Sequence, residues 1–133
     1  MATPATQDVL KWKEILHISH DQAIGFAKAL GGIESESDLY SENNVRIRRQ
    51  SDILELMSPD DPPVFIHNSE TGEVPTHYGH MAHHPNHARA LKERADKVGI
   101  EAIVYAPEIG LVDPSRELKK GTKKGVNRTF HIF

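Results

Sequence analysis

The chain has 133 residues, 38% of them hydrophobic and 26% charged, and its formal net charge is −3. This length allows one domain with a core of its own, and the composition lies outside the range of disordered chains. The net charge excludes a strongly basic nucleic-acid-binding domain, and the absence of cysteine excludes disulfides, thiolate zinc sites, iron–sulfur clusters and a cysteine nucleophile.

Residues 1–58 predict a helical segment. The apolar residues of its first helix, within residues 8–18, are spaced to share one face: Val9, Trp12 and Leu16. Ser19 and Gln22 fit a capping box that starts a second helix, which Gly31-Gly32 ends. A third helix is predicted over residues 43–57. It must stop by Ser58-Pro59, because the residue before a proline is pushed out of the helical region.

Residues 59–112 predict a βαβ unit with a His-rich loop. Val64-Phe65-Ile66 is a short apolar run of the kind found in buried parallel strands, and residues 100–105 predict a second strand. Between them, residues 86–98 predict a helix that Gly99 ends. The fold class is therefore α/β, with strands 64–67 and 101–105 parallel. The apolar face that packs the helix across them is formed by Ala88, Leu91 and Ala95.

The end of the chain differs in charge from the rest. Residues 113–133 contain six Lys and Arg but two Asp and Glu, and they predict a basic, flexible tail. Two strands alone cannot bury both faces of a sheet. We therefore expect either the N-terminal helices to cover the strands or another chain to complete the sheet. No nucleic-acid partner is expected.

Three segments together resemble a known family. They are Asp-Pro-Pro-Val-Phe-Ile at 61–66, His-Ala-Arg-Ala-Leu at 87–91 and Val-Gly-Ile-Glu-Ala at 98–102. They are similar to the C-terminal βαβ unit of the α/β-hydrolases, in the esterase and lipase branch. The resemblance covers residues 50–107. It implies that a catalytic acid follows the first strand, where Glu70 or Glu73 lies within 69–75, and that a catalytic His follows the last strand.

The chain departs from this family at the residues that perform its chemistry. No Ser is followed two residues later by Gly, so the G-x-S-x-G nucleophile turn is missing. The place of the catalytic His, residues 106–110, contains no His. Because triad catalysis needs nucleophile, base and acid together, we expect no hydrolysis by this chain alone. Whether it is a truncated enzyme or a diverged domain stays open. Glu70 and Glu73 equally fit a solvated turn around Gly72.

A histidine cluster offers an alternative function. Its members are His77, His80, His83, His84 and His87. Neutral imidazole is the commonest metal ligand, so the loop is a candidate zinc or nickel site, and no other cofactor is expected. Gly79 and Pro85 favour a loop, and the H-E-x-x-H motif is absent. The competing interpretation is that these histidines are ordinary loop residues.

The sequence also predicts a compartment. No apolar run approaches the roughly 18 residues of a membrane span, so no membrane partner is expected. Residues 1–7 lack the basic start and apolar stretch of a signal peptide. We therefore expect a cytoplasmic protein.

Overall fold

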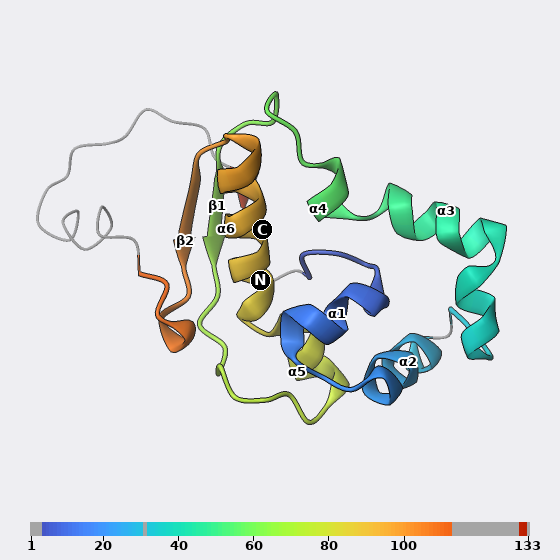
Figure 1. Cartoon of the computed structure of the whole chain (residues 1–133). Helices are drawn as coiled ribbons and strands as arrows, with labels where there is room; N and C mark the ends of the chain where they lie inside the picture. Colours follow the sequence, from blue (N-terminus) through green and yellow to red (C-terminus); the bar gives the residue numbers. More distant parts are fainter. Residues whose placement is uncertain (1–3, 31, 113–130, 133) are drawn as a thin grey trace, which may run out of the picture.

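The computed structural model describes residues 4–30, 32–112 and 131–132 and has a mixed α/β fold (Figure 1). Its helices are α1 (Val9–Leu16), α2 (His20–Ala29), η1 (Glu36–Tyr40), α3 (Glu42–Gln50), α4 (Ile53–Leu56), α5 (Tyr78–His83), α6 (Asn86–Val98) and η2 (Pro107–Ile109). Its strands are β1 (Val64–His67), β2 (Ala102–Tyr105) and β3 (His131–Ile132). No helix in the described ranges is long and apolar enough to span a bilayer.

The strands form one parallel sheet in the order β2-β1-β3. β1 pairs with β2 from Val64↔Ala102 to His67↔Tyr105, and α6 connects the two strands. The prediction of adjacent parallel strands joined by a helix is therefore confirmed. β3, at the end of the predicted flexible tail, pairs with Val64 and Phe65. The rest of that tail, 113–130 and 133, lies outside the described residues.

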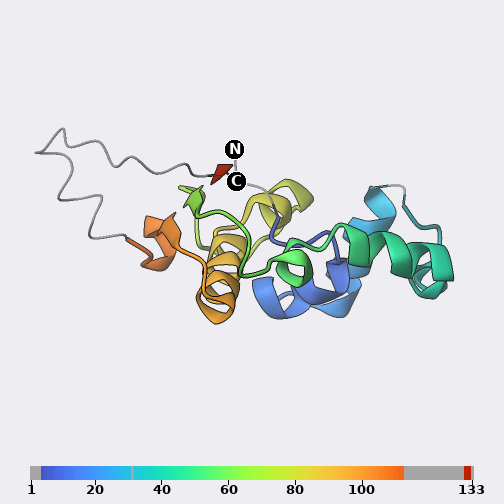
Figure 2. The same cartoon turned by 90° about the horizontal axis from the view of Figure 1, so that it is seen from above.

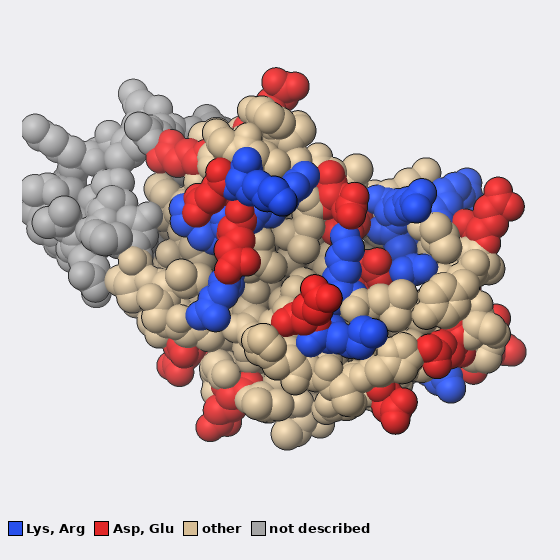
Figure 3. Space-filling view, in the orientation of Figure 1, with Lys and Arg blue, Asp and Glu red and all other residues tan. Residues whose placement is uncertain are grey.

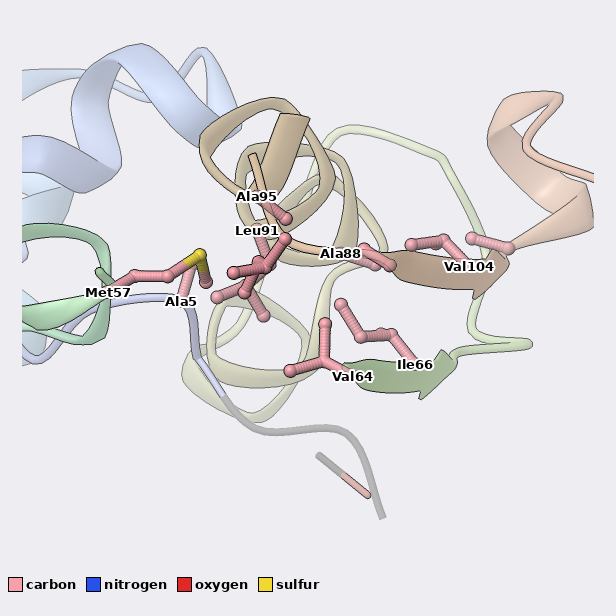
Figure 4. Close-up of a cluster of buried hydrophobic side chains, with 11 residues drawn as sticks. Ala5, Met57, Val64, Ile66, Ala88, Leu91, Ala95 and Val104 are labelled. Atoms are coloured by element: carbon pink, nitrogen blue, oxygen red, sulfur yellow. The ribbon is translucent and has the colours of Figure 1, made fainter. Parts of the chain in front are cut away.

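The core of the βαβ unit lies between the sheet and α6. Val64 and Ile66 point from β1 toward the helix (Figure 4), where they meet the buried face predicted from the sequence. Ala88, Leu91 and Ala95 form that face, and each is at most 1% exposed. Gly99 ends α6 in the left-handed conformation, with φ of 88°, which costs glycine little because it has no Cβ. Burying Leu91 contributes roughly 2 kcal/mol.

The N-terminal helices pack on the other side of α6, away from the strands (Figure 1, Figure 2). Trp12 of α1 packs against Phe26 of α2, with ring centroids 4.5 Å apart. The predicted capping box is present, since Ser19 and Gln22 each accept the other's backbone N–H. α2 ends at Ala29. Gly31, one of the two glycines expected to end it, lies outside the described residues.

The single helix predicted over residues 43–57 is wrong, because the chain forms α3 and α4 with a break at Ser51-Asp52. Asp52 is extended, and its carboxylate accepts the N–H of Leu54, so it caps α4 instead of continuing α3. The same carboxylate binds Lys11 of α1.

On the face shown in Figure 3, Lys and Arg intermix with Asp and Glu, so this face has no extended patch of one sign.

Each of the two hydrophobic clusters contains side chains from both sides of residue 58. The cluster of the βαβ unit includes Ala5 and Met57 from the N-terminal part of the chain. The cluster of the N-terminal helices includes Met81 of α5. The predicted helical segment and βαβ unit therefore share their cores, and each buries side chains that the other supplies.

Candidate functional site

The candidate site lies where β1 and β2 end, since parallel α/β sheets bind ligands outside the carboxyl ends of their strands. Asn68, directly after β1, is buried and forms hydrogen bonds with three segments of the chain there. Its N–H donates to Tyr105 O (2.9 Å), and its side-chain oxygen accepts the N–H of Glu70 (2.9 Å). Its amide nitrogen donates to His83 O (2.9 Å). Sequence reasoning missed Asn68, although an Asn after an apolar run is a turn signal.

Glu70 and Glu73, the predicted acid positions, are both exposed. The turn that holds them is built by backbone N–H groups, because Glu70 N donates to Asn68 and Glu73 N donates to Thr71 Oγ1 (3.3 Å). Gly72 between them lies against the segment after β2. A Cβ at Gly72 would be 2.8 Å from the carbonyl oxygen of Glu108, so any larger residue would push the two segments apart. The loop after β1 and the segment after β2 are therefore in contact.

The loop and α5 enclose a polar pocket of about 370 Å³. Carboxylates, imidazoles and threonine hydroxyls line it together with one valine and one glycine: Glu70, Thr71, Glu73, Val74, Thr76, His77, Gly79, His80 and His83. The expectation of an irregular loop throughout this stretch is wrong, because α5 occupies residues 78–83. His77 caps the start of that helix by accepting the N–H of His80 at Nδ1. Met81 packs in the hydrophobic cluster of the N-terminal helices. Gly79 lies inside α5.

Two imidazoles of the cluster hold the loop in place. His80 Nε2 lies 2.8 Å from Thr71 O, and His84 Nε2 lies 2.9 Å from Glu73 O. A carbonyl oxygen can only accept, so both Nε2 atoms carry hydrogen. His84 Nδ1 accepts the N–H of Asn86 (3.0 Å), which leaves this ring neutral with both nitrogens engaged. Burial lowers the pKa of His84, which agrees with the neutral form.

His87 belongs to the core and not to the pocket. It is 1% exposed, and its Nδ1 accepts the N–H of Ala5 (3.2 Å) while its Nε2 donates to Met81 O (2.9 Å). Its ring meets Trp12 edge-on with centroids 5.0 Å apart. Burial lowers the pKa of His87 to about 4. Both nitrogens are therefore occupied, and the ring is neutral near pH 7.

The predicted metal ligands do not converge as a set. A ligating imidazole must direct a nitrogen lone pair at the metal, and His84 and His87 have none left. His77 accepts a hydrogen bond at Nδ1, so its Nε2 carries the hydrogen. Within the described ranges, no three His, Asp or Glu side chains are placed to hold a metal ion. A metal ion bound through His77 Nδ1, His84 or His87 would therefore have to break one of these hydrogen bonds.

Comparison of the chain with family models, with curated proteins and with solved structures finds no match. Two features carry the most information: the contact between the loop after β1 and the segment after β2, and the pocket beside that loop.

Proposed function

We propose that this chain is a C-terminal module of the α/β-hydrolase type, similar to esterases and lipases, and that it does not hydrolyse esters on its own. The observation that carries the proposal is the contact of Gly72 with Glu108. In the family that the sequence resembles, the acid loop and the segment with the catalytic His meet at this edge of the sheet. Here the two corresponding segments touch.

The local structure around that contact supports the same proposal. β1 and β2 are adjacent and parallel, and α6 packs on them through the face predicted from the sequence. Asn68 binds Tyr105 at the end of β2 and Glu70 in the loop. Asn68 thereby ties the backbone of Glu70 to the end of β2, which supports an acid at this position, since a catalytic acid must be held in place.

The chain lacks the other groups that ester hydrolysis needs. The sequence has no nucleophile turn, and residues 106–110 have no imidazole. The buried imidazole of His84 has both nitrogens engaged and is held in one tautomer. A general base must take a proton from the nucleophile, and that ring offers no lone pair for it.

We propose further that another chain completes the sheet and supplies the nucleophile. β2 covers β1 over four residue pairs, whereas β3 covers its other edge over two. Ile66 and His67, at the carboxyl half of β1, have no partner strand on that edge in the part of the chain that the structure describes. An additional parallel strand there would extend the sheet on the side of the acid loop.

Two assays test the proposal. The purified chain should show no hydrolysis of p-nitrophenyl butyrate above buffer, and sustained turnover that a serine-directed phosphonate abolishes would refute the first part. A tagged chain isolated from its native cell should carry a second protein that a fluorophosphonate probe labels. A native preparation in which the probe labels nothing would refute the second part.

A matched pair of variants connects the second assay to the site. Gly72→Ala should separate the loop after β1 from residues 106–110 and reduce recovery of the labelled partner, because its Cβ would clash with Glu108. Gly32→Ala is the control, since a Cβ at Gly32 would meet nothing within 4 Å. Equal recovery with both variants would show that the Gly72 contact has no part in the association.

A further inference from the structure

A single buried imidazole joins the two hydrophobic clusters. We name residues 4–7, which precede α1, the N-terminal arm. Ala5 of this arm is fully buried in the cluster of the βαβ unit, together with Ala88 and Leu91 of α6. His87, at the start of α6, accepts the Ala5 N–H across 82 positions of sequence and also touches Trp12 of α1.

Both hydrogen bonds of His87 require one particular form of the ring. Nε2 must carry hydrogen to donate to Met81 O, and Nδ1 must be bare to accept from Ala5 N. Protonation would place a hydrogen on Nδ1, opposite the N–H of Ala5, so two donors would face each other. The ring is 1% exposed, and water cannot solvate the new charge unless the arm moves.

We propose that the contact between His87 and Ala5 is an acid-released latch between the N-terminal arm and the βαβ unit. When His87 takes up a proton, Ala5 leaves the core and the ring reaches water. The arm stays anchored toward α1, because Thr6 O accepts the indole N–H of Trp12 (2.9 Å) and Thr6 Oγ1 accepts the N–H of Asp8 (2.9 Å). The arm would therefore separate from α6 while the helices stay folded and while Asn86 of α6 still donates to Ile15 O of α1 (2.9 Å).

The groups around His87 also disfavour a proton on its buried ring. The titratable groups that bear on His87 are His84 and His83, and repulsion from a proton on either of them would lower the pKa of His87 further. The other groups against the ring are uncharged: the indole of Trp12 and the backbones of Ala5 and Met81. His84 accepts the N–H of Asn86 in the same way, so acid loosens the same corner of α6 at a second point.

The size of the effect follows from the proton affinities of the closed and open forms. Burial holds the pKa of His87 at about 4 in the closed form, and a solvated imidazole has about 6.5. Opening is then favoured on the order of a hundredfold more at pH 4 than at pH 7. This latch is independent of the proposed hydrolase-type function.

The fluorescence of Trp12 tests the latch, because this is the only tryptophan of the chain. The full chain is titrated from pH 7 to pH 4, and helix content is followed by far-ultraviolet circular dichroism in the same samples. We expect Trp12 emission to change with a midpoint between pH 4 and 6.5 while the helical signal persists. Unchanged emission down to pH 4, or loss of both signals in one step, would overturn the proposal.

The variant His87→Gln is the specific control. Its amide offers one acceptor and one donor but does not titrate, so the emission change should disappear. A transition of the same midpoint in His87→Gln would refute the latch. If this variant does not fold, nuclear magnetic resonance of the unmodified chain decides. The Ala5 amide and the His87 ring must then titrate together, and separate midpoints would refute the latch equally.

Discussion

Asp52 decides where one predicted helix breaks into two, and its substitution tests that role. Its carboxylate is nearly inaccessible, with 2% of the residue exposed. One oxygen accepts the N–H of Leu54 (3.1 Å) and caps α4, and the other binds the ammonium of Lys11. Asp52→Asn keeps an oxygen for the cap and removes the charge, whereas Asp52→Ala removes both. The two variants therefore separate the cap from the ion pair.

The expected costs follow from these two contacts. Loss of an N-cap lowers the free energy of unfolding by about 1 kcal/mol. The ion pair is screened, because the side chain of Lys11 is 36% exposed and also binds Glu55 (2.9 Å). We therefore assign the pair about 1 kcal/mol. Asp52→Asn should cost about 1 kcal/mol and Asp52→Ala about 2 kcal/mol.

Equilibrium unfolding in urea measures both costs, and a double-mutant cycle of Asp52→Asn with Lys11→Met isolates the pair. The coupling energy should be about 1 kcal/mol and should fall at high salt. Asp96→Asn is the matched control, because Asp96 is exposed and pairs with Lys92 on the surface of α6 (2.7 Å), so its cost should stay below about 0.5 kcal/mol. If Asp52→Ala costs no more than Asp52→Asn, the capping explanation of the break is wrong.

Three further predictions concern the core and the histidines. The folded-state pKa of His87 is lowered to about 4, so its contribution to stability is fully present above pH 6.5 and is lost as the pH falls toward 4. Urea unfolding should therefore show a loss of at most about 3 kcal/mol over this range, and His87→Gln but not the exposed His67→Gln should flatten that dependence. Leu91→Ala should lower the free energy of unfolding by about 3 kcal/mol, because Leu91 is 1% exposed. The control Leu56→Ala should change the free energy of unfolding by less than about 0.5 kcal/mol, because Leu56 is 59% exposed. Zinc or nickel should raise the melting temperature little, since binding through His77 or His84 would displace a hydrogen bond and no three His, Asp or Glu side chains of the described residues are placed to hold a metal ion. A large rise that vanishes in His80→Ala/His83→Ala/His84→Ala would establish a metal site instead.

The βαβ unit was predictable because every local rule agrees there. The spacing of Ala88, Leu91 and Ala95 requires one buried helix face, and Gly99 supplies the left-handed residue that ends it. The apolar run at Val64 needs a strand buried by neighbours, and the run at Ala102 supplies its partner. Within this unit, tertiary packing reinforces what the sequence favours locally.

The errors occur where a side chain contacts a distant part of the chain. The periodicity of residues 43–57 is continuous, and it contains no sign that Asp52 faces Lys11 across 41 positions. In the same way, Gly79 favours a loop by propensity, yet α5 forms because Met81 has a place in the N-terminal core. Propensity is a weak preference that such contacts outweigh.

The histidine cluster shows why composition alone does not identify a metal site. A ligand and a structural imidazole are the same residue, and they differ in what each nitrogen faces. Here carbonyl oxygens of Thr71 and Glu73 face the Nε2 atoms of His80 and His84. These contacts exist because the loop after β1 folds back over α5, and that path depends on Asn68 and on the closeness of Gly72 to Glu108. The same contact that supports the hydrolase-type proposal therefore commits the Nε2 atoms of His80 and His84 to holding the loop.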